Sequence, residues 1–231
     1  MENLLQNGLS ALGLPTENIP KLRHFSDLLL EKNKVMNLTA ITEEKDVATL
    51  HLLDSAALLN MADLSGKKVV DVGTGAGFPG MPMRIVKEDF SLTLLDSLNK
   101  RIDFLKDCCA ELGFTDVNCV HARAEEFAAG NRESFDFATS RAVANLSVLS
   151  ELALPLVKVG GQFLAMKSVD SEEEIDTAKS AIKTLGGKIS RVEDYTIPGT
   201  DVTHRVVVID KVSPTPAKYP RAFAKIKKQP L

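Results

Sequence analysis

VVDVGTGAGFPG, residues 69–80, joins a short apolar run to a turn that carries glycines at positions 73, 75 and 77. The apolar run predicts a buried strand, and the glycines permit backbone conformations in which the chain approaches a ligand closely. The same stretch contains Gly75-x-Gly77-x-x-Gly80, which satisfies the dinucleotide-binding fingerprint. A nicotinamide- or flavin-dependent oxidoreductase is therefore one hypothesis for this chain.

Two carboxylates near this loop bear on the choice of ligand. Asp71 stands two residues before Gly73, where it can brace the loop and lie near the cationic amino-acid end of S-adenosylmethionine, whereas it would repel a pyrophosphate. Asp96 ends the next predicted strand, about twenty residues after the loop, where it can bind the ribose hydroxyls of either ligand. Asp96 could instead cap a helix ahead of Ser97. Asp71 therefore favours S-adenosylmethionine, whereas Asp96 indicates a nucleoside without distinguishing the two ligands.

From Lys67 onward, short β-branched or apolar runs alternate with helical stretches, which indicates βαβ units and a parallel sheet. After a helix over 172–185, two runs follow without a helix between them, so they should pair antiparallel. The predicted strands are 67–72, 92–96, 117–120, 135–139, 162–166, 188–195 and 205–209. The predicted fold class is α/β, namely the Rossmann-like S-adenosylmethionine-dependent methyltransferase fold with a mostly parallel seven-stranded sheet and a helical N-terminal extension.

The predicted organisation is one globular domain in three parts. Apolar residues at helical spacing predict amphipathic helices over 1–64 that cover the core. The methyltransferase core spans 65–211, and 212–231 is a basic C-terminal tail. From Lys211 to Leu231, both included, there are six basic residues and no acidic one, so this segment either is a solvated end or contacts RNA.

Composition narrows the class of protein further. The chain has 231 residues, of which 44% are hydrophobic and 26% charged, and its net charge is −3. No apolar run approaches the roughly 20 residues that span a bilayer, so we expect a cytoplasmic protein without membrane contact. Three cysteines without paired metal-ligand spacing predict neither a disulfide framework nor a metal site.

The end of the fourth predicted strand, FDFATSRA over 135–142, bears on the methyl acceptor. It lacks the Asn/Asp-Pro-Pro-aromatic tetrapeptide that holds an exocyclic amine, and no cysteine stands where a covalent route to a pyrimidine carbon needs one. An acceptor that is already nucleophilic, such as guanine N7, needs only alignment and exclusion of water. Arg141 could contact the cofactor, a phosphate or the O6/N7 edge of guanine, or form a structural ion pair. No catalytic residue is assigned.

Two other positions could contribute to the cofactor site. Arg123-Ala124-Glu125 follows the third strand on the rim where ligands bind in open α/β folds, and an adenine edge could be recognised there. Phe78 could form an apolar wall of the pocket or anchor the core. The predicted cofactor-binding set comprises Gly73, Gly75, Gly77, Phe78, Asp96, Ala124, Glu125 and Arg141.

Several motifs together resemble the glucose-inhibited division protein B family, whose members methylate guanine N7 in small-subunit ribosomal RNA. They cover nearly the whole chain: NLTAI at 37–41, HLLDS at 51–55, DVGTGAGFPG at 71–80, LDSLNKR at 95–101, RAEE at 123–126, SRA at 140–142 and YPR at 219–221. The resemblance implies that Gly73, Phe78, Ala124, Glu125 and Arg141 contact S-adenosylmethionine. It also implies a guanine of 16S ribosomal RNA near the decoding region as the target and the small ribosomal subunit as partner, with no obligatory protein partner evident.

Basic residues outside the loop are candidates for RNA phosphate contacts. Arg101, Lys167 and Arg221 are the predicted RNA-binding residues, accompanied by Lys100 and the tail lysines 218, 225, 227 and 228. His51 and Asn37 could line the substrate side of the cleft, although a histidine among leucines is more often a packing residue. Besides the oxidoreductase, a non-catalytic ribosome-assembly or cell-division factor remains as an alternative function.

Overall fold

Within residues 1–141 and 144–231, which the computed structural model describes, seven strands form one sheet in the order β3-β2-β1-β4-β5-β7-β6. The first five strands pair in parallel, and β7 pairs antiparallel with both β5 and β6. The strands are β1 Lys68–Val72, β2 Ser91–Asp96, β3 Val117–His121, β4 Phe135–Arg141, β5 Val157–Ser168, β6 Gly187–Thr196 and β7 Thr203–Lys211. The predicted fold class and the antiparallel pairing of the last two strands are confirmed. Ala142, part of the SRA motif, lies outside the described residues.

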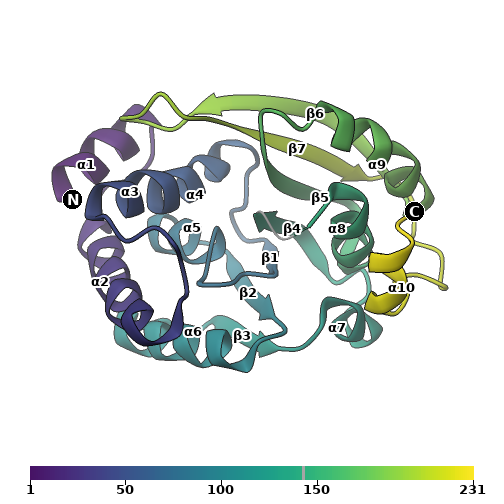
Figure 1. Ribbon diagram of the computed structural model, residues 1–231, viewed down its shortest axis with the longest axis horizontal. Coiled ribbons are helices and arrows are strands. Elements are labelled where there is room, and N and C mark those ends of the chain that lie inside the picture. The colour runs from purple at the N-terminus through teal and green to yellow at the C-terminus, as the bar shows by residue number, and fades with distance from the viewer. Residues whose placement is uncertain (142–143) are drawn as a thin grey trace.

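Helices cover both faces of the sheet (Figure 1). Alternate side chains of each strand belong to two separate apolar clusters; Leu94 joins the cluster with α2 and α6, and Leu95 joins the cluster with α8 and α9. The helices of the connections are α5 Gly80–Val86, α6 Asn99–Leu112, α7 Ala124–Gly130, α8 Leu146–Ala153, η3 Leu154–Leu156 and α9 Glu172–Thr184. None of the helices in the described part of the chain is long and apolar enough to cross a membrane.

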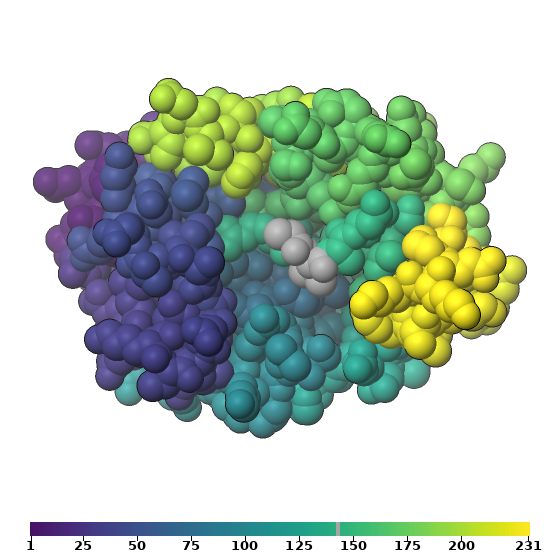
Figure 2. Space-filling view, viewed as in Figure 1, coloured from purple at the N-terminus to yellow at the C-terminus, as the bar shows by residue number. Residues whose placement is uncertain are grey.

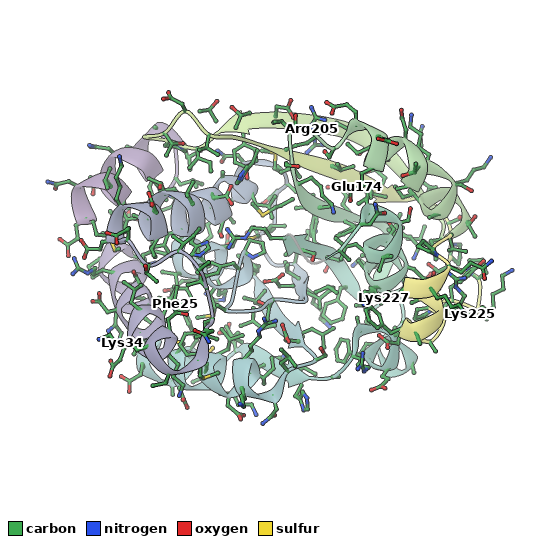
Figure 3. All side chains as sticks on the ribbon, viewed as in Figure 1. Phe25, Lys34, Glu174, Arg205, Lys225 and Lys227 are labelled. Carbon is green, nitrogen blue, oxygen red and sulfur yellow. The ribbon has the colours of Figure 1, made fainter. Side chains whose placement is uncertain are left out.

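The N-terminal helices pack on the face that carries the glycine loop. They are α1 Glu2–Ala11, α2 Ile19–Met36, α3 Glu44–Asp46, the π-helix η1 Val47–Leu53, α4 Asp54–Ala57 and η2 Leu58–Asn60. Phe25 lies on α2 (Figure 3) and is fully buried. Its ring meets that of Phe78 edge to face with 5.7 Å between centroids. This packing explains why the apolar stripe of α2 is present: it closes the glycine loop from one side.

The C-terminal segment also packs on the core. Tyr219 and Ile226 are buried, the latter within α10 Phe223–Lys228. Arg132 donates hydrogen bonds to the carbonyl oxygens of Thr215, Pro216 and Tyr219. The alternative of a solvated end therefore does not describe this segment, whose lysines are exposed while Tyr219 and Ile226 are buried.

Candidate functional site

The glycine loop connects β1 to α5 at the carboxyl edge of the sheet. Gly73, Gly75 and Gly77 all have positive φ, at 70°, 60° and 98°, a region that glycine adopts without steric cost. Asp71 braces the loop from below, because its Oδ2 accepts hydrogen bonds from Thr74 Oγ1 at 2.7 Å and from Gly80 N at 2.9 Å. The expected bracing role of Asp71 is confirmed.

Asp71 is fully buried, and its Oδ1 has no hydrogen-bond partner among the described residues. Desolvation raises the pKa of this carboxyl to about 6, against the opposing hydrogen bonds from Thr74 and Gly80. The folded chain therefore holds the Asp71 proton more tightly than the unfolded chain does. The protonated Asp71 carboxyl therefore stabilises the folded chain relative to the unfolded chain. This contribution is complete below the unfolded pKa near 3.8 and is lost as pH rises through the folded pKa of about 6.

We predict that Asp71→Asn removes this pH dependence. Relative to the variant, the wild-type free energy of unfolding should fall by up to roughly 3 kcal/mol between pH 4 and pH 7. Urea denaturation of both proteins across this range measures the difference, and the variant corrects for all other titrating groups. A wild-type-to-variant difference that does not change with pH would show that Asp71 ionises like an exposed carboxyl.

A pocket of about 520 Å³ lies above the glycine loop, and we call it the loop pocket. A recess of about 130 Å³ adjoins it and shares Gly73, Asp96 and Ser97 with it. Of the predicted cofactor residues, the loop pocket is lined by Gly73, Gly75, Phe78, Asp96 and Arg141, and the recess by Gly73, Asp96, Ala124 and Glu125.

Asp96 stands between the loop pocket and the recess and also fixes the loop. Its Oδ2 accepts hydrogen bonds from Gly75 N at 2.9 Å and from Arg101 Nη1 at 3.3 Å, and its Oδ1 accepts one from Leu98 N at 2.9 Å. A carboxylate has about four acceptor sites, so Asp96 keeps capacity for a further donor. Leu98, not Asp96, is the N-cap residue of α6, so the helix-cap alternative for Asp96 is wrong, and its contact with ribose hydroxyls stays a prediction.

A second pocket, of about 840 Å³, lies next to the loop pocket at the ends of β4 and β5, and we call it the large pocket. Two residues, His51 and Arg141, line both pockets and form the wall between them. The surface is hollowed between the blue N-terminal helices and the green segments of β6, β7 and α9 (Figure 2). Ligands in open α/β folds bind at this edge of the sheet.

The shared wall is a stack of three side chains. The His51 ring lies on the Phe78 ring with 4.4 Å between centroids, and the Arg141 guanidinium carbon lies 4.8 Å from the centroid of Phe78. Arg141 Nη2 donates to His51 Nδ1 at 3.0 Å, so His51 carries its proton on Nε2 and donates it to Thr39 Oγ1 at 2.8 Å. Burial and the Arg141 charge lower the pKa of His51 to about 4, so the ring is neutral at pH 7.

Asp54 holds the wall in place from behind. This fully buried carboxylate accepts hydrogen bonds from Arg141 Nη1 at 3.1 Å, Tyr195 Oη at 2.7 Å and His204 Nδ1 at 2.8 Å. Burial acts to raise the Asp54 pKa, but the hydrogen bond from His204 and the Arg141 charge outweigh it, so the pKa is lowered. The structural ion pair considered for Arg141 therefore exists, on a residue that also lines both pockets.

Five other predicted residues have different surroundings. Gly77 lines neither pocket, because an added Cβ there would lie 2.8 Å from Leu105 and Met81 side-chain atoms. Lys167 lines the large pocket but is paired with Glu174 at 2.6 Å. Arg101 is at the rim of the loop pocket, and Arg221 is bound to Glu151. Asn37 ends α2 in a left-handed conformation and lines none of these cavities.

The family model described as rRNA small subunit methyltransferase G matches residues 18–202. The chain belongs to this family. A ribosomal RNA small subunit methyltransferase G of Alkaliphilus metalliredigens is 46% identical over 233 residues, which cover 99% of this chain and 98% of the relative. The relative of the same name from Clostridium perfringens is 44% identical over 234 residues, with the same coverage of both chains. The resemblance read from the motifs is confirmed.

Solved structures of more distant proteins share the fold of this chain. TrmN from Thermus thermophilus superposes with a TM-score of 0.55 at 20% identity, over 68% of this chain and 48% of that chain. The ribosomal protein L11 methylase of Lactobacillus delbrueckii subsp. bulgaricus superposes with a TM-score of 0.54 at 16% identity, over 70% and 79%. At these identities the comparison supports the Rossmann-like fold alone.

Sequence reasoning missed Asp54, Tyr195, His204 and Glu174. Asp54 stands within the HLLDS motif three residues after His51, which is helical spacing and was the one available signal. Tyr195 and His204 come from the final hairpin, and Glu174 comes from the first turn of α9. Nothing in a local pattern connects these positions to residue 141.

Proposed function

We propose that this chain transfers a methyl group from S-adenosylmethionine to N7 of a guanine in 16S ribosomal RNA of the small ribosomal subunit, in the cytoplasm. The observation that carries the proposal is that a glycine-loop pocket and a larger pocket meet at one wall of Arg141 and His51. Family membership supplies the class of substrate. We also propose that residues 1–64 act as a cover, 65–211 as the methyltransferase core and 212–231 as a basic tail of one globular domain.

The loop pocket and its recess suit S-adenosylmethionine. The space over Gly75 is open, since an added Cβ would meet nothing within 4 Å, and the loop backbone can approach a ligand there. Asp96 has acceptor capacity for ribose hydroxyls, and the recess beside Ala124 and Glu125 would take the adenine. Asp71 carries a charge at neutral pH below the loop, which favours the cationic amino-acid end.

When bound, S-adenosylmethionine supplies an electrophilic methyl group on its sulfonium. Guanine N7 carries a lone pair and no proton, so the N7–C bond can form as the S–C bond breaks without a general base. His51 fits this requirement, because its Nδ1 already accepts from Arg141 and its Nε2 already donates to Thr39. The wall residues therefore orient the two ligands and exclude water, and we assign no proton transfer to them.

RNA contacts are proposed for the basic residues around the pockets. Arg101 is partly exposed at the rim of the loop pocket, and Lys167 lies in the large pocket. Lys225 and Lys227 project from α10 at the far end of the molecule from the N-terminal helices (Figure 3). Arg221 connects that helix to the core through Glu151, so its proposed RNA contact would add to a structural role.

The deciding experiment is incubation of the purified chain with methyl-labelled S-adenosylmethionine and unmethylated small ribosomal subunits, followed by nucleoside digestion. Labelled 7-methylguanosine is the expected product, accompanied by release of S-adenosylhomocysteine. Label on another nucleoside would show that the methyl acceptor is not guanine N7. Cofactor binding without any label would favour a non-catalytic assembly factor, and binding of NAD instead would favour an oxidoreductase.

Gly75→Ala tests the cofactor site directly. We expect the variant to fold with a loss of about 1–2 kcal/mol, because only the left-handed φ of 60° is strained. The added methyl projects into the open space over the loop, where it would clash with a cofactor held against the backbone, so we expect a loss of about 1–3 kcal/mol, or about 5- to 150-fold weaker cofactor binding. Calorimetric titration with S-adenosylmethionine measures it. Wild-type affinity in this variant would place the cofactor elsewhere.

A further inference from the structure

The large pocket contains charged side chains that already neutralise one another. Arg141 is paired with Asp54 at 3.1 Å, and Lys167 is paired with Glu174 at 2.6 Å. His51 is neutral at pH 7, and His204, whose pKa is raised by its hydrogen bond to Asp54, is paired with that carboxylate at 2.8 Å. A pocket built to hold a phosphate would present unpaired cations, so this one suits an uncharged planar group with polar edges, such as a nucleobase.

Among the described residues, the two carboxylate oxygens of Glu174 differ in that only Oε1 has polar partners. This side chain lies in the first turn of α9 (Figure 3). Its Oε1 meets Lys167 Nζ at 2.6 Å and accepts from Leu146 N at 2.5 Å. Its Oε2 accepts no hydrogen bond from residues 1–141 or 144–231, although the side chain is only 25% exposed and lines the large pocket. The two bonds at Oε1 fix the carboxylate, so Oε2 is a positioned acceptor.

We propose that the large pocket receives the guanine base and that Glu174 determines its specificity, with Oε2 accepting the N1–H and a 2-amino N–H of guanine. This inference rests on the proposed function. N7 must reach the loop pocket where the two pockets meet beside Arg141 and His51, so the N1 and 2-amino edge, on the opposite side of the ring system, faces away from the loop pocket. Glu174 lines the large pocket but not the loop pocket, which is the position this orientation requires.

The carboxylate distinguishes guanine from adenine and also favours the reaction. Adenine presents the N1 lone pair and no 2-amino group at that edge, so it would meet Oε2 with an acceptor against an acceptor. Methylation at N7 leaves the base positively charged, because no proton departs. A negative charge at N1–H is therefore stabilising in the transition state more than in the ground state, and Glu174 should contribute to kcat as well as to binding.

Glu174→Gln tests this with Glu173→Gln as the matched control. Both replace a carboxylate by an amide in the same helical turn, but Glu173 is exposed and lines no part of the large pocket. The glutamine can keep the acceptor at Oε1 for Lys167 and Leu146, while its amide NH₂ opposes the guanine donors. We expect Glu173→Gln to stay within about twofold of wild type and Glu174→Gln to lose about 10- to 100-fold in kcat/KM on small subunits.

Two further measurements keep the outcome unambiguous. S-adenosylmethionine affinity and the thermal midpoint should match in the two variants, which separates base recognition from folding. Wild-type enzyme should also be slower on subunits reconstituted with inosine, which lacks the 2-amino group, at the methylated position. If the wild type transfers no methyl group, the proposed function itself is wrong. If the wild type is active and both variants methylate at the same rate, this inference is wrong. If Glu174→Gln does not fold, equal wild-type rates on inosine and guanosine would overturn it instead.

Discussion

Asp54→Ala should lower the free energy of unfolding by about 3–5 kcal/mol, the typical cost of removing one partner from a buried ion pair. Asp54 is fully buried and accepts hydrogen bonds from Arg141, Tyr195 and His204. Its removal leaves the Arg141 guanidinium, which is 16% exposed, without its carboxylate. Urea denaturation at pH 7 measures the loss.

Tyr195→Phe is the control for Asp54→Ala. It deletes one hydrogen bond to the same carboxylate and keeps the ion pair, so the loss should be about 1.5–3 kcal/mol. Losses below about 1 kcal/mol for Asp54→Ala would mean that water replaces the carboxylate and that the pair behaves like one at the surface. In the folded variant, cofactor binding should also weaken, because Arg141 lines the loop pocket and loses its support.

Arg221→Ala should destabilise the chain by a similar amount, about 3–5 kcal/mol. Glu151 on α8 is fully buried and accepts hydrogen bonds from the Arg221 backbone N at 2.9 Å, Nε at 2.8 Å and Nη2 at 2.6 Å. Without the guanidinium, a buried carboxylate remains with one backbone donor. Urea denaturation measures the loss in the free energy of unfolding of the whole chain. Amide hydrogen exchange in α10 should accelerate by more than that global loss accounts for.

The matched variant replaces both partners, Glu151→Met with Arg221→Met. Apolar side chains of similar volume leave no buried charge, so most of the stability lost in Arg221→Ala should return. If the double variant is as unstable as the single one, the segment depends on the charge pair itself. If Arg221→Ala is stable but small-subunit binding weakens, the RNA-contact prediction for this arginine gains support over its structural role.

The parallel sheet and its final hairpin could be predicted because each strand is a local apolar run and the glycines mark the loop. The observed strands differ from the predicted ranges mainly at the ends; β5 begins at Val157 rather than at Gln162. Most residues that line the loop pocket could also be predicted, because the strand-loop junctions of a parallel α/β sheet converge at one edge.

The wall and the large pocket could not be predicted in this way. Asp54 contacts side chains 87, 141 and 150 positions away, and no local periodicity specifies such pairs. The π-helix over Val47–Leu53 also departs from the α-helical spacing that the leucines suggest, and it carries His51. The tail was ambiguous because its basic residues are evident in sequence, whereas the buried Glu151 that receives Arg221 lies 70 positions earlier.

Arg141 and His51 line both pockets, so the proposed binding of cofactor and base shares one structural element. If an occupant of one pocket shifts this wall, it changes the affinity of the other pocket, and linkage requires the same factor in the reverse order. A base that tightens cofactor binding tenfold must itself bind tenfold more tightly to the cofactor-loaded chain. Loss of one product would then weaken the binding of the other by the same factor, so the wall would couple the two ligands as well as align them.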